Sequence, residues 1–378
     1  MAFPSLSIGD LTAKMPIVQG GMGVGISLSG LASAVANQGG IGVIAGAMIG
    51  MKEPDVAKNP IEANLRALRQ ELTKAREKTQ GIIGVNIMVA LTTFSQMVRT
   101  AIENRADIIF SGAGLPLEMP KHLLQACEEK KEEFKTKLVP IVSSARAATL
   151  IARKWLSRFD YLPDAFVVEG PKAGGHLGFK REEINDPNFA LEVLVPQVVE
   201  AAKRLEDQKG RAVPVIAAGG IYTGEDIKKF LDLGASGVQM GTRFVATKEC
   251  DADDRFKQSY IAAREEDITI IKSPVGMPGR ALQNDFIEAA RQGNKKPFKC
   301  VFHCVHTCTC DQEKTPYCIA QALISAMKGN LERGFAFCGA NVARVNSIVS
   351  VKELMESLQQ EFDQTISKGK QTLQGLLK

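Results

Sequence analysis

Short apolar segments, each closed by glycine, serine or asparagine, recur along most of this sequence. Between them lie stretches with apolar residues three and four positions apart, which is the spacing of one face of a helix. Continuous apolar strands that alternate with amphipathic helices predict parallel strands covered by helices. The eight predicted strands lie within residues 16–21, 41–46, 82–88, 107–114, 137–144, 165–170, 213–220 and 237–244.

Eight strand–helix units are the number that closes a (β/α)8 barrel, or TIM barrel. An open doubly wound sheet is the main alternative, and it would carry a G-x-G-x-x-G turn after its first strand. The glycines of residues 21–25, in Gly-Met-Gly-Val-Gly, do not have that spacing. We therefore predict an α/β fold with the barrel over residues 1–290 and a small helical, cysteine-rich cap over residues 291–378.

A barrel of this kind forms its active site where the strands end at their C-terminal edge. The sequence Glu-Gly-Pro-Lys-Ala-Gly-Gly-His-Leu-Gly, residues 169–178, follows the sixth strand and places His176 beside Gly174 and Gly175. Glycine lets a ligand approach the backbone closely, so we expect His176 to face a bound molecule at the barrel mouth. The other strand ends that we expect there are Gly21, Met22, Gly23, Asn86 and Glu169.

The loops after the seventh and eighth strands most often hold a phosphate group in this fold. Glycines in these loops expose backbone N–H groups, which are the donors that a phosphate needs. Thr223 begins the helix after the seventh strand as its predicted N-cap. The predicted phosphate-binding residues are Ala218, Gly219, Gly220, Gly241 and Thr242. A phosphate site alone does not distinguish a substrate from a cofactor.

Several of these segments resemble those of one enzyme family, in the same order along the chain. The matching segments are PIVQGGMG at 16–23, AVANQGGIG at 34–42, GVNIM at 84–88, EGPKAGGHLG at 169–178, IAAGGI at 216–221 and QMGTRF at 239–244. Together they resemble the FMN-dependent nitronate monooxygenases (2-nitropropane dioxygenases) and the related FMN enoyl-acyl-carrier-protein reductases. The resemblance covers residues 5–290.

The resemblance implies one FMN with its phosphate on Gly219, Gly220, Gly241 and Thr242. By the same resemblance the flavin ring lies near Gly21, Met22, Gly23 and Asn86. Glu169 and residues 173–176 would line the flavin and substrate pocket, and His176 would bind substrate or transfer a proton. A neutral imidazole suits both tasks, because it can accept a proton from carbon or donate a hydrogen bond to an oxygen.

Three functions remain open from the sequence. In the first, an alkyl nitronate reduces FMN and oxygen completes the cycle. In the second, NAD(P)H reduces FMN and the hydride passes to an activated double bond, and the segments at 19–23 and 84–88 are closer to this enoyl reductase branch. In the third, the barrel is a flavin-binding sensor, which would not need a proton-transfer group at position 176.

The composition limits the partners of this chain. Its 47 basic and 42 acidic residues give a formal charge of +5 without a basic block, so we expect no nucleic-acid partner. We expect no membrane association either, because the N-terminus lacks a signal-peptide pattern and the apolar stretches are short and broken by glycine. The sequence therefore predicts a cytoplasmic enzyme with a small-molecule substrate, and a homodimer is the default for this fold.

Cysteines gather in the C-terminal region, which also contains helical patterns at residues 319–330 and 351–367. Thiolates bind zinc and iron–sulfur clusters, so we predict a metal centre, although the spacing does not identify the metal. The alternative is a helix face of small apolar residues, with thiols at every fourth position. The candidate ligands are Cys300, Cys304, Cys308, Cys310 and Cys318.

Overall fold

Eight parallel strands form a closed barrel in the computed structural model, which describes residues 3–294, 298, 300–308 and 315–376. The strands pair in the order β3-β11-β10-β8-β7-β6-β5-β4, and a parallel bridge between Val18 and Ile41 joins the two ends of the sheet. This arrangement confirms the predicted TIM barrel. The barrel strands are β3 (Ile17–Gln19), β4 (Gly42–Ala45), β5 (Ile83–Asn86), β6 (Ile108–Ser111), β7 (Lys137–Val142), β8 (Phe166–Glu169), β10 (Val215–Ala218) and β11 (Gly237–Met240).

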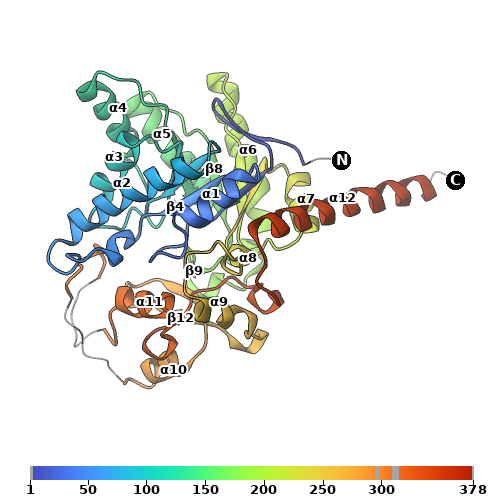
Figure 1. Ribbon diagram of the computed structural model, residues 1–378. Helices are drawn as coiled ribbons and strands as arrows, with labels where there is room; N and C mark the ends of the chain where they lie inside the picture. The colour runs from blue at the N-terminus through green and yellow to red at the C-terminus, as the bar shows by residue number, and fades with distance from the viewer. Residues whose placement is uncertain (1–2, 295–297, 299, 309–314, 377–378) are drawn as a thin grey trace.

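Helices follow the strands and surround the barrel (Figure 1). Ser144 starts α5 as its N-cap by accepting a hydrogen bond from Ala147 N–H. Thr223 is the N-cap of α7, as predicted, and Asp226 closes a capping box with it. The helices between the strands are α1 (Ser29–Asn37), α2 (Pro60–Lys78), α3 (Phe94–Glu103), α4 (Met119–Lys130), α5 (Ala145–Phe159), α6 (Leu191–Lys209) and α7 (Gly224–Asp232).

The interior of the barrel is filled by side chains. Alternate strand residues such as Phe110 and Val167 point inward and are fully buried. An antiparallel hairpin before the barrel, β1 (Leu6–Ile8) and β2 (Leu11–Ala13), adds Leu6 and Ile8 to the same apolar cluster. Leu6 lies against Gly237, the first residue of β11, so the hairpin closes the N-terminal end of the barrel. The opposite end stays available for a site.

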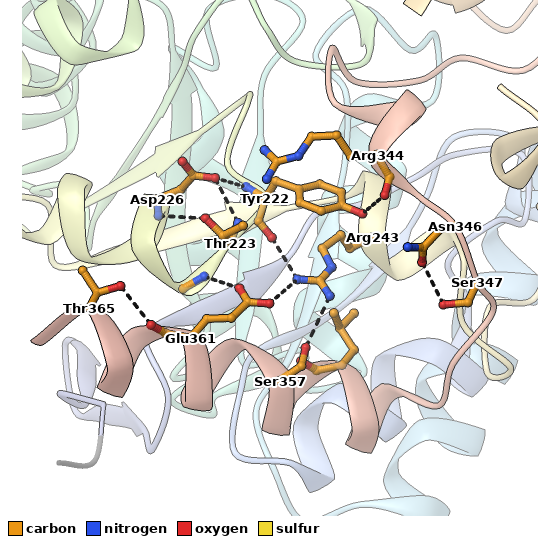
Figure 2. Close-up of polar contacts among 12 residues, drawn as sticks. Tyr222, Thr223, Asp226, Arg243, Arg344, Asn346, Ser347, Ser357, Glu361 and Thr365 are labelled. Carbon is orange, nitrogen blue, oxygen red and sulfur yellow. Dashed lines mark hydrogen bonds and ion pairs between the residues drawn. The ribbon is translucent and has the colours of Figure 1, made fainter. Parts of the chain in front are cut away.

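The long C-terminal helix α12 (Val351–Leu376) packs between α7 and α1, where an eighth barrel helix belongs (Figure 1). Figure 2 shows its polar anchors. Glu361 of α12 accepts a hydrogen bond from Gly224 N–H at 2.7 Å, and Arg243 donates to Ser357 at 3.3 Å. The chain therefore completes the helical layer with its last helix.

The segment between β11 and α12 builds a second layer over the barrel mouth. It contains α8 (Thr242–Val245), α9 (Asp254–Ile261), α10 (Asp285–Arg291) and α11 (Ile319–Met327), of which α9, α10 and α11 group below the barrel in Figure 1. It also contains the strands β12 (Ile268–Lys272) and β13 (Pro278–Leu282), which form an antiparallel sheet with β9 (Gly175–His176). The predicted cysteine-rich helical cap is not confirmed, and a division at residue 290 stays a prediction.

In the part of the chain that the structure describes, no helix combines the length and the apolar character that a membrane crossing requires.

Candidate functional site

One large cavity opens at the C-terminal ends of the barrel strands, with a volume of about 560 Å³. This size lies within the range of small-molecule and cofactor sites. The cavity brings together residues from the ends of all eight barrel strands and from the segment that follows β11. All the predicted flavin and substrate residues line it: Gly21, Met22, Gly23, Asn86, Glu169, Gly174, Gly175, His176, Ala218, Gly219, Gly220, Gly241 and Thr242.

One wall of the cavity is formed by residues with small side chains or none, so a ligand can approach the backbone there. Gly21 lies directly against the side chain of Asn86, so a Cβ added at Gly21 would overlap the Asn86 side chain. A Cβ at Gly23 would come within 3.1 Å of the Ala47 Cβ. The Met22 N–H donates to the Ser27 hydroxyl at 2.9 Å, which fixes this turn. Such a wall leaves space for a flat ligand.

The loops after β10 and β11 form the opposite end of the cavity. Gly219 and Gly220 have φ angles of +96° and +84°, a conformation that L side chains rarely adopt. Within the described residues, no protein acceptor takes the N–H groups of Gly219 or Gly220. Gly241 has only the Met22 sulfur near its Cβ direction, at 3.6 Å. Free donors and open space at this end fit a phosphate group.

The first turn of α7 is not available to a phosphate. The Tyr222 and Thr223 N–H groups both donate to the Asp226 carboxylate at 2.9 Å, and Gly224 N–H donates to Glu361 (Figure 2). Carboxylates are the favourable partners of a helix N-terminus, and here they already occupy it. A phosphate must therefore rely on the glycine N–H groups before α7 and on the start of α8.

A C-terminal strap, residues 337–341, closes the cavity from the side of the second layer. Its Gly339 N–H donates to the Thr242 hydroxyl at 3.2 Å, and Asn341 donates to the Gly220 carbonyl at 2.7 Å. Its Ala340 N–H donates to the Lys172 carbonyl at 3.1 Å. The strap thus contacts both glycine loops and the histidine loop. Sequence reasoning missed it, and its only signal was the Cys-Gly pair at 338–339.

His176 lies on β9 at the edge of the cavity. Its Nε2 shares a hydrogen bond of 2.7 Å with the Ser273 hydroxyl, and its ring packs edge-on against Phe337 with the centroids 5.0 Å apart. Burial lowers the pKa of His176 to about 4, because a charged imidazolium would lose its hydration there. The imidazole is therefore neutral at physiological pH. Ser273 is a second residue that the sequence analysis missed.

Glu169 ends β8 and lines the same cavity. Burial raises the pKa of its carboxyl group to about 7, since no cation nearby stabilises the charged form. Among the described residues, burial is the only cause of this shift, with no hydrogen bond or charge partner contributing to it. A carboxyl group that titrates near neutrality inside a cavity is typical of a functional position.

The predicted metal ligands do not form a metal site among the described residues, where no three His, Cys, Asp or Glu side chains gather to hold an ion. Cys304 lines the cavity, and burial raises the pKa of its thiol to about 12, with Cys318, Cys308 and Cys300 as further causes. Cys310 lies outside the described residues. The arrangement of the described thiols thus gives the metal prediction no support.

Comparisons with known proteins agree with this geometry. A sequence model described as nitronate monooxygenase matches residues 5–361. A "Probable nitronate monooxygenase" of Staphylococcus aureus strain Newman is 30% identical over 308 residues, which cover 75% of this chain and 79% of that protein. The solved structure of FabK from Thermotoga maritima has a TM-score of 0.70 and 28% identity, and the comparison covers 94% of this chain and 95% of FabK.

A second group of relatives carries a different name. A Mycobacterium tuberculosis protein named (3aS,4S,5R,7aS)-5-hydroxy-7a-methyl-1-oxo-octahydro-1H-indene-4-carboxyl-CoA dehydrogenase is 30% identical over 280 residues, or 74% of this chain. This chain spans 66% of the length of that relative and 64% of its counterpart from Rhodococcus jostii. The family match extends from the N-terminal hairpin into α12 and confirms the resemblance carried by the sequence motifs. The chain belongs to the nitronate monooxygenase family.

Proposed function

We propose that this protein is an FMN-dependent oxidoreductase that oxidises alkyl nitronates in the cavity at the barrel mouth. The observation that supports this function best is that residues predicted separately, from five strand ends, line one cavity of about 560 Å³. A bound flavin would accept electrons from the substrate, so the protein needs only to bind the cofactor and to orient the substrate. The neutral His176 suits an anionic substrate, because a neutral imidazole keeps one N–H group that can donate a hydrogen bond to the negatively charged oxygen.

The two ends of the cavity suggest where the cofactor binds. We assign the FMN phosphate to the loops of Gly219, Gly220, Gly241 and Thr242, because these residues line the cavity and no described protein acceptor takes the N–H groups of Gly219 and Gly220. We assign the ring to the wall of small residues around Gly21, where the backbone can approach a flat ligand. His176 and Glu169 would then lie on the substrate side of the ring.

Stopped-flow reduction of the purified FMN-loaded protein tests this function. We expect anaerobic ethylnitronate to bleach the flavin absorbance rapidly, and oxygen to restore it. NADH and NADPH should leave the oxidised spectrum unchanged over the same time. A protein that releases FAD on denaturation, or that takes up no flavin after reconstitution, would contradict the proposal at its first step.

An NAD(P)H-dependent enoyl reductase is the second candidate. It is favoured by the segments at 19–23 and 84–88, which resemble the enoyl-acyl-carrier-protein reductase branch, and by the likeness to FabK over 94% of the chain. The same stopped-flow experiment separates the two functions. Rapid bleaching by NADH or NADPH, followed by reoxidation with an unsaturated thioester, would identify the reductase.

A metal centre in the cysteine-rich segment remains a prediction that rests on the sequence alone. Metal analysis of anaerobically purified protein tests it, because an exposed cluster can be lost in air. Stoichiometric iron or zinc would confirm the prediction, whereas their absence would favour thiols that only pack against the second layer.

A cytoplasmic location and a homodimer also remain predictions. Sedimentation of the FMN-loaded protein would give its mass in solution. A monomer would contradict the predicted dimer.

A further inference from the structure

A tight turn holds Ser273 next to the histidine of the cavity. Ser273 begins the turn between β12 and β13, where its carbonyl accepts from Gly276 N–H and its N–H donates to the Met277 carbonyl, both at 3.0 Å. Pro274 follows it at the position that favours such a turn. β13 then pairs with β9 and places Gly279 opposite His176. One small sheet therefore fixes both partners of the 2.7 Å hydrogen bond.

The hydrogen bonds of the Ser273 hydroxyl determine which partner donates. A serine hydroxyl has one hydrogen to donate and two lone pairs to accept with. Within the described residues, its oxygen accepts from Val275 N–H at 3.4 Å and meets His176 Nε2 at 2.7 Å. If Nε2 carried the ring hydrogen, both contacts would use lone pairs and the hydroxyl hydrogen would have no acceptor. Ser273 is only 3% exposed, so that hydrogen could not turn to bulk water instead.

We propose that Ser273 donates its hydroxyl hydrogen to Nε2 of His176 and so holds the neutral imidazole with its hydrogen on Nδ1. Ser273 is then a positioning residue, since it does not line the cavity itself. Nδ1 is the one ring nitrogen left for a ligand, because no described residue bonds to it. His176 thus faces its ligand as a hydrogen-bond donor and has no free lone pair for removing a proton from carbon.

This tautomer selects among substrates, and that consequence rests on the proposed function. An Nδ1–H group matches the oxygen of a nitronate, which already carries the negative charge. The same group would match a thioester carbonyl in an enoyl reductase. A neutral nitroalkane, in contrast, must first lose a carbon proton, and His176 in this state cannot accept it. The structure therefore favours preformed nitronates over neutral nitroalkanes.

Nitrogen-15 NMR of the FMN-loaded protein, labelled at histidine, tests the tautomer directly. The chain has four histidines, so a His176→Gln variant assigns the signal of interest. We expect the Nδ1 signal at the position of a protonated ring nitrogen and the Nε2 signal at that of an unprotonated one. Ser273→Ala should yield a mixture of both tautomers, and Ser273→Thr should restore the single one. A protonated Nε2 in the wild-type protein would overturn the proposal.

Kinetics with two probes provide the second test. At equal concentration, we expect ethylnitronate to be oxidised at least about 100-fold faster than neutral nitroethane, the scale of a missing general base. Ser273→Ala should lower kcat for ethylnitronate by about 2- to 10-fold, the effect of one lost hydrogen bond, with little change in FMN content. Equal rates for the two probes would overturn the proposal. If neither probe reacts, the proposed function fails, while the NMR measurement still decides the tautomer.

Discussion

The barrel strand ends and the segment between β11 and α12 line the same cavity by different means. At the strand ends, the fold itself sets the position of a residue. Gly219 directly follows β10, so it lies at the barrel mouth by topology. The later segment places Ser273 and Asn341 at the cavity through a small sheet and through the strap. The comparison teaches that topology alone brings the barrel strand ends to the cavity, whereas the later segment reaches it through hydrogen bonds between residues far apart in the sequence.

The largest expected effect belongs to His176, in the segment that follows barrel strand β8. His176→Ala should lower kcat for nitronate oxidation by about 10²–10³-fold, which is the effect of losing one donor to a developing or bound oxyanion. FMN content and Tm should change little, because among the described residues the His176 side chain forms a hydrogen bond only with Ser273. Steady-state kinetics and thermal unfolding measure the two effects.

His122→Ala is the matched control, since His122 lies on α4 against Phe94 and does not line the cavity. It should turn over at the wild-type rate. If His176→Ala loses flavin while its remaining holoenzyme turns over normally, the histidine has a structural role only.

The next largest effect tests the phosphate end. Gly241→Ala should weaken FMN binding by about 10- to 100-fold, because a methyl group in the place of a phosphate oxygen costs about 1–3 kcal/mol. The substitution is tolerated by the protein itself, since its Cβ would meet only the Met22 sulfur at 3.6 Å and Gly241 has a φ of −119°. Fluorescence titration of the FMN-free protein measures the affinity. Unchanged affinity would move the phosphate elsewhere in the cavity.

A smaller effect is expected in the strap. Asn341→Ala removes the hydrogen bond to the Gly220 carbonyl, and should weaken FMN binding by about 2- to 10-fold. Asn346→Ala is the control, because Asn346 is exposed and its side chain bonds only to Ser347 among the described residues (Figure 2). Equal FMN affinity of the two variants would show that the strap only covers the glycine loop and does not order it.

The smallest effect concerns Glu169 and pH. Its folded pKa of about 7 lies above its unfolded value, so the folded state holds the proton more tightly. The contribution of this proton to the free energy of unfolding is fully present below pH 4.5 and is lost as pH rises through 7. We expect the FMN-free wild type to lose about 1 kcal/mol of unfolding free energy relative to Glu169→Gln between pH 6.5 and 8. Urea unfolding at several pH values measures this, and parallel curves would contradict it.

Much of the barrel could be predicted from periodicity. Each predicted strand contains one barrel strand, because a fully buried parallel strand reads as a short apolar run. The ends of those runs also indicated the cavity, since topology brings them together. Local sequence could not indicate Ser273, whose partner lies 97 positions away and meets it through β13 and β9.

The position of α12 on the barrel could not be predicted from the sequence either. Its apolar spacing predicts a helix over residues 351–367, but not the surface that the helix covers. The cysteine pattern predicted a feature that the structure does not support. The clustering of thiols suggested a metal centre, but the described residues form no group of metal ligands. Cysteines serve equally well as small buried side chains, so their number alone does not distinguish the two uses.

The position of α12 also has a consequence for how the chain is made. Leu354, Met355 and Leu358 of this helix are almost completely buried, and they cover surfaces of elements synthesised much earlier. Phe362 meets Phe3 with ring centroids 4.5 Å apart, so the last helix also holds the beginning of the chain. Contacts between such distant parts form slowly, and a nascent chain exposes apolar surface until they do. A ribosome-bound chain that stops short of residue 351 would therefore keep an open helical layer, and it would need protection from aggregation until α12 emerges.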